Sequence, residues 1–348
     1  MNLIAGFALT AGILHALIRD PLHLYAEIRS EKLAMLDQWR GRASSAVFGS
    51  SHVDNGVDPR AFDAVLRGTT GESTTLNLGI SGGCQTEQET VARTFIDSLP
   101  EPVPNSPPRF VLLEITASAN FTEEHLMHPR AINIYDLHTM ELAWEFAGRD
   151  RIGWRRAIGR SGFALVAGLL HYTNVGMLSS KIFSPPLNSA LIANETGDDR
   201  RGLTPNHMAP RDSREFTANQ EILANGRTAQ SKLGEILEGH LAMLQNLAEA
   251  ARQKNVQFVY FVAPRLDNLE EYPEYPASIQ GPLGPVLILN EGLPSVHPEL
   301  YRADMWHDPS HLTESGAGIF SRLLADDLRL KLHLTAAGAV GGSDVAVR

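Results

Sequence analysis

Four short apolar runs, alternating with stretches of helical character, constrain the fold of this chain more than any other feature. We predict strands at residues 45–49, 75–80, 109–116 and 256–264, and helices at residues 59–67, 86–99 and 214–254. Strand and helix alternate in this way in parallel α/β sheets. The runs are largely apolar on both faces, as strands covered by helices on both sides require. We therefore expect a three-layer α/β/α domain with a parallel sheet.

A long insertion separates the third and fourth predicted strands. About 140 residues lie between them, far more than one crossover connection needs. We assign residues 120–213 to a helical insertion. It contains the basic stretch 149–160 (RDRIGWRRAIGR), followed by the apolar run 163–170. One interpretation is a cap that packs on the domain; the other is a lid that meets a membrane surface or an anionic saccharide.

The two ends of the chain differ in character from its middle. Residues 3–18 are nearly all apolar, a length between a signal-peptide core and the roughly 20 residues of a membrane span. This segment is either a membrane anchor or a packed helix. We predict an apolar leader and helical connector over residues 1–42, the α/β domain over residues 43–334, and a flexible tail over residues 335–348.

Charge and cysteine content exclude several classes of function. The formal net charge is −10, which argues against a nucleic-acid-binding protein, because such proteins neutralise phosphates with clustered Lys and Arg. The one cysteine, Cys84, cannot form an internal disulfide or a thiolate metal site. A small uncharged or cationic partner is compatible with this composition.

Ser51 is the candidate nucleophile. It follows the first predicted strand in the turn Gly49-Ser50-Ser51, so its hydroxyl should lie at the carboxyl edge of the sheet, where open α/β sheets place ligands. A nucleophilic serine needs a base, a carboxylate that orients the base, and donors for the oxyanion. The alternative role of Ser51 is that of an ordinary turn residue.

Asp308 and His311 supply the other parts of such a site. They lie in the segment 306–312 (WHDPSHL), just before a helix predicted at residues 313–328. On one turn the Asp308 carboxylate can reach His311 Nδ1 and leave Nε2 facing Ser51. A helix cap is the alternative.

A metal site is a further alternative for this region. Its candidate ligands would be side chains suited to zinc: His297, Asp304, His307, Asp308 and His311. His307 and His311 are four residues apart, a spacing that would place both on one face of a helix. Pro309 disfavours a helical conformation at the residue before it, which argues against that shared face. We expect neither a metal nor an organic cofactor.

These motifs resemble the SGNH (GDSL-like) hydrolase superfamily. Gly49-Ser50-Ser51 and Asp308-Pro309-Ser310-His311 look like its first and last sequence blocks. The resemblance implies a flavodoxin-like fold in which Ser51, Asp308 and His311 form the catalytic triad. Ser50 stands where the family usually has aspartate. A Gly-Ser-Ser form resembles the membrane-anchored members that serve teichoic-acid D-alanylation and polysaccharide acetylation.

The resemblance also implies the oxyanion hole. Residues 77–82 (NLGISG) match the second family block and indicate the backbone amide of Gly82, beside that of Ser51. The third block is normally Gly-x-Asn-Asp, and here the match is weaker. The asparagine position falls on Ser118, and Asn120 follows two residues later. Either side chain is a candidate third donor.

The function expected from these observations is that of a serine-dependent acyl ester hydrolase or O-acyltransferase. It would act through an acyl-Ser51 intermediate on an acylated carbohydrate or another small ester. Membrane association in a bacterial cell envelope is the expected location, with the cytoplasm as the alternative. The rival hypothesis is a non-catalytic, membrane-tethered protein that binds or assembles glycans. The weak third block and the absent aspartate motivate this rival.

Overall fold

The structure is a computed structural model. It describes residues 6, 9–10, 12–13, 27–70, 73–83, 85–102, 108–115, 140, 154–173, 200–206, 213–224, 238–266, 274–281 and 284–334. Most of the predicted leader, much of the predicted insertion and the whole tail from residue 335 lie outside the described residues. The α/β part of the chain, in contrast, is described almost completely.

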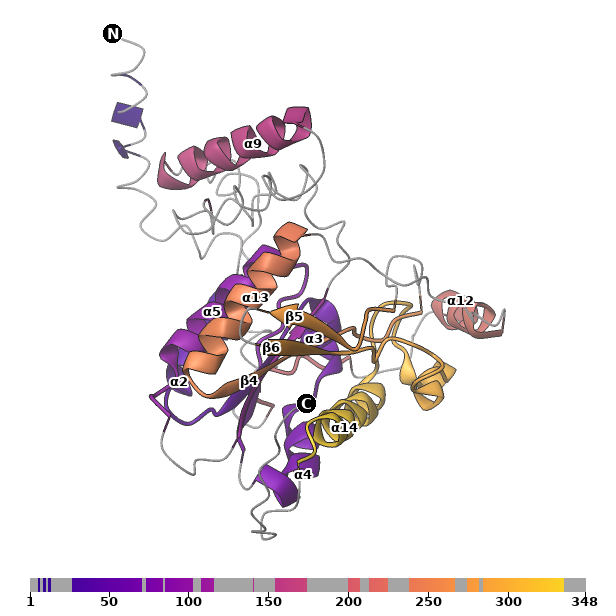
Figure 1. The fold of residues 1–348 in the computed structure, drawn as a ribbon. Coiled ribbons are helices and arrows are strands. Elements are labelled where there is room, and N and C mark those ends of the chain that lie inside the picture. Colours follow the sequence, from indigo (N-terminus) through magenta and orange to yellow (C-terminus); the bar gives the residue numbers. More distant parts are fainter. Residues whose placement is uncertain are drawn as a thin grey trace.

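A six-stranded, mostly parallel sheet forms the centre of the molecule (Figure 1). Its order is β2-β1-β3-β4-β6-β5, and β5 at one edge pairs antiparallel with β6. The strand bounds are β1 Ser45–Phe48, β2 Thr75–Asn77, β3 Arg109–Glu114, β4 Val256–Phe261, β5 Ser278–Gly281 and β6 Gly284–Leu289. The predicted α/β class with a parallel sheet is confirmed.

Helices cover both faces of this sheet. Figure 1 shows α2, α5 and α13 on one side, with α4 and α14 on the other. The helix bounds are α2 Glu27–Gln38, α3 Ser51–Gly56, α4 Pro59–Thr70, α5 Gln85–Ser98, α9 Trp154–Thr173, α12 Ser213–Ala224, α13 Glu238–Gln253 and α14 Glu314–Lys331; two short 3-10 helices are η5 Pro298–Leu300 and η6 Ala303–Met305. The three-layer arrangement thus agrees with the prediction.

The alternating side chains of the strands divide the core into two halves. In β1, Ala46 and Phe48 belong to the cluster under α5 and α13, while Val47 belongs to the cluster under α4 and α14. Successive side chains of a strand point to opposite faces. A strand with apolar side chains on both faces therefore contributes to both halves, and all four β1 residues are buried.

Several elements differ from the sequence-based expectation. Strands β5 and β6 were not predicted, because the segment 278–289 (SIQGPLGPVLIL) is interrupted by glycine and proline, which normally indicate turns. The single helix expected at residues 214–254 is described as α12 and α13, with residues 225–237 outside the description. A short helix, α3, begins at Ser51 itself, where a loop was expected.

Helix α2 packs against the sheet. Its Met35 and Leu36 are buried in the core cluster that also contains Phe95 of α5. The predicted domain boundary at residue 43 separates this helix from the α/β domain, whereas its apolar side chains contribute to that domain's core. The polar stretch that we interpreted as a connector is thus a packed helix from residue 27 to residue 38.

Candidate active site

Ser51 is the first residue of α3 and lies just beyond the carboxyl end of β1. Ser50 is the N-cap of this helix, and its hydroxyl accepts a hydrogen bond from the His52 amide at 3.3 Å. Serine is among the residues that cap helices best, because its side chain satisfies an amide with no partner within the helix. The strand, the cap and the short helix together place the Ser51 hydroxyl at the edge of the sheet.

His311 and Asp308 meet Ser51 at this edge. His311 Nε2 lies 2.8 Å from Ser51 Oγ, and His311 Nδ1 lies 2.8 Å from Asp308 Oδ2. The backbone amides of Ser310 and His311 also donate to Asp308 Oδ1, at 2.7 and 2.8 Å. A serine, an imidazole and a carboxylate are thus joined in one hydrogen-bonded chain, although 260 residues separate the first two in sequence.

The protonation state of Asp308 determines what this chain can do. Burial raises the pKa of Asp308, but its hydrogen bond and charge interaction with His311 and the two amide hydrogen bonds outweigh burial and leave that pKa below its usual value. The ionised carboxylate only accepts hydrogen bonds, so His311 Nδ1 carries the proton. His311 Nε2 is then the acceptor for the Ser51 hydroxyl proton, as nucleophilic catalysis requires.

A short hairpin holds Asp308 and His311 in place. Trp306 and Leu312 form an antiparallel bridge, and the His307 amide donates to the His311 carbonyl at 2.9 Å. The Trp306 ring is fully buried, and its indole N–H donates to the Leu300 carbonyl at 2.7 Å. Thr313 then caps α14 by accepting from the Gly316 amide. The hairpin therefore has a rigid base in the core.

The candidate oxyanion loop follows β2. The Leu78 and Ile80 amides each donate to a β1-side carbonyl, those of Val47 and Gly49, at 2.8 Å. This pairing brings the turn after Ile80 alongside the turn that carries Ser51. Gly82 in that turn has φ +66°, a conformation that glycine adopts without the strain of a Cβ atom. Ser118 and Asn120, the alternative third donors, lie outside the described residues, as does Cys84.

A second carboxylate and imidazole pair lies beside the first, and it was not predicted from the sequence. Glu114 at the end of β3 is fully buried, and one carboxylate oxygen lies 2.8 Å from His52 Nδ1. Its other oxygen accepts from the Ser50 amide at 2.6 Å and the Ser50 hydroxyl at 2.9 Å. The His52 and His311 rings are 5.9 Å apart. The sequence signal for this pair was Glu114 itself, an acidic residue within an otherwise largely apolar strand, since a buried acidic side chain needs a partner.

The charge of Glu114 is set by these neighbours. Burial raises the pKa of Glu114, but the charge and hydrogen bond of His52, together with both hydrogen bonds from Ser50, lower it below its usual value overall. A carboxylate therefore sits against Ser50, where the resembled family usually has an aspartate in the motif itself. Here the acidic group comes from the neighbouring strand.

A buried ion pair connects α3 to the candidate oxyanion loop. Asp54 of α3 lies 2.8 Å from Lys32 of α2, with side chains only 3% and 2% exposed. Asp54 also accepts from the hydroxyls of Ser81, at 2.6 Å, and Thr204, at 3.0 Å. Lys32 donates in addition to the carbonyls of Asn77 and Gly202. Nothing local in the sequence indicates this pairing, because its members come from four separate segments.

The residues considered for a metal site do not come together as one group. Asp308 and His311 belong to the chain with Ser51, while His297 lies 2.6 Å from Glu291 and 3.3 Å from Asp327 of α14. Among the described residues, these last three are the group with ligand-like spacing. Burial lowers the pKa of His297, but hydrogen bonds and charge from both carboxylates raise it to about 10. We therefore interpret the group as an imidazolium held by two acidic side chains.

Comparisons with protein-family models, with curated proteins and with solved structures find no match for this chain. Within the described ranges, no helix has both the length and the apolar character needed to cross a membrane.

Proposed function

We propose that this protein is a serine-dependent acyl ester hydrolase or O-acyltransferase that works through an acyl-Ser51 intermediate. The observation that carries the proposal is the hydrogen-bonded chain from Ser51 Oγ through His311 to Asp308. A serine hydroxyl is a weak nucleophile unless a positioned base removes its proton. Here the base lies within hydrogen-bond reach, and its orienting carboxylate is ionised.

In the first step, His311 Nε2 takes the Ser51 proton as Ser51 Oγ attacks the ester carbonyl. The carbonyl π electrons move to oxygen, and the backbone amides of Ser51 and Gly82 are the proposed donors to that oxyanion. The ester C–O bond then breaks. The leaving alcohol receives the proton from His311, and the acyl group remains on Ser51.

In the second step, His311 Nε2 removes a proton from water or from a sugar hydroxyl. The acceptor oxygen attacks the acyl carbonyl, and the bond to Ser51 Oγ breaks as His311 returns the proton to it. Water as acceptor gives hydrolysis, and a sugar hydroxyl gives transfer. An acylated carbohydrate is the proposed substrate, because the Gly49-Ser50-Ser51 form resembles family members that act on cell-surface polysaccharides.

Covalent labelling with a fluorophosphonate tests the activated serine directly. We expect peptide mass spectrometry to find the adduct on Ser51 of the wild type and nowhere in Ser51→Ala. His311→Ala should label at least about 10³-fold more slowly, because the hydroxyl then lacks its base. His333→Ala, which removes an exposed histidine beyond α14, is the matched control and should label at the wild-type rate.

Two further outcomes separate this proposal from its rival. Release of acetate from an O-acetylated glycan by the wild type, but not by Ser51→Ala, supports acyl-ester chemistry on a carbohydrate. A folded wild type that neither labels nor releases acetate, yet binds the same glycan as tightly as Ser51→Ala does, would establish the non-catalytic binding protein instead. Equal acetate release by both proteins would refute Ser51 as nucleophile.

A further inference from the structure

Helix α9 carries an apolar stripe on its outward face. Its large apolar side chains recur at helical spacing, and most are more than half exposed: Trp154 69%, Ile158 64%, Leu165 55%, Val166 45% and Leu169 53%. Residues three, four and seven positions apart share one face of a helix. Most of the described large apolar side chains with this degree of exposure belong to this one helix.

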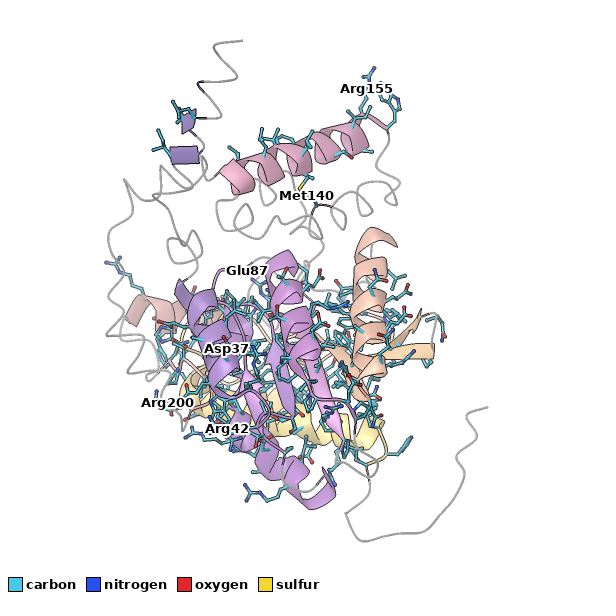
Figure 2. All side chains as sticks on the ribbon, turned by 90° about the vertical axis from the view of Figure 1, so that its left-hand side faces the viewer. Asp37, Arg42, Glu87, Met140, Arg155 and Arg200 are labelled. Atoms are coloured by element: carbon cyan, nitrogen blue, oxygen red, sulfur yellow. The ribbon has the colours of Figure 1, made fainter. Side chains whose placement is uncertain are left out.

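The opposite face of α9 carries small residues and faces the protein. Ala164 and Ala167 are fully buried, and a Cβ atom added at Gly168 would collide with the side chain of Met140. Figure 2 shows Met140 between α9 and the α/β body, with Arg155 at one end of the helix. A helix on the surface of a soluble protein normally buries its large apolar side chains and exposes polar ones. In α9 this order is reversed.

The charge of α9 is opposite to that of the chain as a whole. The helix contains three arginines and no aspartate or glutamate, whereas the chain has a formal net charge of −10. Arg155 is exposed, and its guanidinium lies 5.3 Å from the centre of the Trp154 ring. An aromatic ring and a basic group side by side suit the boundary between acyl chains and anionic headgroups.

Two more exposed apolar side chains lie at the same end of the molecule. Leu9 is 67% exposed and Ile13 is 51% exposed. Both views place the described positions of this N-terminal segment near α9 and away from the sheet (Figures 1 and 2). Apolar surface from two segments distant in sequence therefore gathers on one side, as a flat apolar partner would require.

We propose that α9 lies in the surface of a lipid bilayer with anionic headgroups, with its outer stripe among the acyl chains. Helix α9 belongs to the predicted insertion, for which a packed cap was the other interpretation. Its contact with the membrane is independent of the chemistry at Ser51. The exposed stripe runs along α9 from Trp154 to Leu169, so the helix would lie along the membrane surface.

Vesicle cosedimentation of the full chain tests the proposal. We expect binding to vesicles of equal parts phosphatidylcholine and phosphatidylglycerol, and weaker binding to phosphatidylcholine alone or at high salt. Ile158→Glu combined with Leu165→Glu should reduce binding to the mixed vesicles at least about tenfold, since two apolar groups leave the acyl region and two negative charges face the headgroups. Both sites are exposed, so the urea midpoint should not change.

Leu330→Glu is the matched control. Leu330 is a 61% exposed leucine in α14, outside the stripe, and the variant should bind as the wild type does. Failure of the wild type to bind mixed vesicles would overturn the proposal. Equal binding to both vesicle types would refute the anionic headgroups. Vesicle-independent dimerisation abolished by the double variant would identify a second copy of the chain as the occupant instead.

A depth measurement keeps the proposal testable if the N-terminal segment binds vesicles by itself. An environment-sensitive fluorophore is attached to Ile158→Cys or, for comparison, to Leu330→Cys, both in a Cys84→Ser background. Mixed vesicles should shift the emission of the first to the blue and leave the second unchanged. Unchanged emission at position 158 in the vesicle-bound protein would show that α9 is outside the bilayer and refute the proposal.

Discussion

At the scale of single residues, Glu114 links the candidate nucleophile to the centre of the sheet. Its carboxylate accepts from the Ser50 amide and hydroxyl on one oxygen and lies against His52 on the other. Ser50 and His52 flank Ser51, so one buried carboxylate contacts the residues on both sides of it: the amide and hydroxyl of Ser50 and the imidazole of His52. Charge-assisted hydrogen bonds of this kind are stronger than neutral ones. Glu114 is thus positioned to orient the turn without contacting a substrate.

Glu114→Gln should slow the candidate nucleophile more than it unfolds the protein. The amide keeps the shape of the carboxylate but carries no charge. Only its oxygen can accept a hydrogen bond, so it can serve as acceptor for Ser50 or for His52, but not for both. We expect fluorophosphonate labelling of Ser51 to slow about ten- to a hundredfold, the usual effect of losing a group that orients a functional side chain. The free energy of unfolding in urea should fall by about 2 kcal/mol. Wild-type labelling in a destabilised variant would show a purely structural role.

At the scale of elements, the Lys32 and Asp54 pair joins α2, α3 and the loop after β2. The three protons of the Lys32 ammonium have three acceptors, on Asp54, Asn77 and Gly202. Burying two charges is costly, and the cost is offset only where hydrogen bonds satisfy both groups. Asp54 also accepts from Ser81, the residue before Gly82. The pair therefore positions the candidate oxyanion loop relative to Ser51.

A double-mutant cycle measures this coupling. Lys32→Met and Asp54→Asn each leave one charged partner alone in the core, and each should lower the free energy of unfolding by about 3 kcal/mol or more. The double variant leaves neither charge unpaired, so its loss should be smaller than the sum. Arg40→Met with Asp37→Asn removes an exposed pair and should cost less than about 1 kcal/mol. Additive losses at the buried pair would contradict the coupling.

At the scale of the whole molecule, the His297 group connects the segment after β6 to α14. Glu291 follows β6, Asp327 belongs to α14, and His297 lies between them. The pKa of His297 in the folded protein is about 10, above the usual value of about 6.5 in an unfolded chain. The folded protein therefore holds a proton that the unfolded chain releases. This group stabilises the fold fully below about pH 6.5.

The part of the stability that comes from the His297 group should accordingly fall as pH rises. The contribution of His297 decreases above about pH 6.5 and is lost as pH passes through about 10. Urea unfolding of wild type and His297→Gln between about pH 6 and pH 10 measures the contribution of this group, since titrations remote from it occur in both proteins. The stability difference should be largest at the acidic end and shrink toward the alkaline end. A pH-independent difference would refute the protonated group.

The sequence by itself determined the features that depend on neighbouring residues. Apolar runs bounded by turns indicated β1, β2, β3 and β4, because a strand buried on both faces is largely apolar along its length. Short motifs placed Ser51 after a strand and Asp308 one turn from His311, and the structure brings these three side chains into contact. Strands β5 and β6 escaped prediction, because their glycines and prolines have the local signature of a turn.

Only the tertiary structure decided the pairings that cross the molecule. Glu114 meets His52 across 62 positions, and Lys32 meets Asp54 across 22. The outward stripe of α9 belongs to the same class, since periodicity identifies an apolar face and not the direction in which it points. The physical reason is that backbone preference and apolar pattern are set by residues close together in the sequence. The ion pairs and hydrogen bonds of this site depend instead on which distant segments the sheet order brings together.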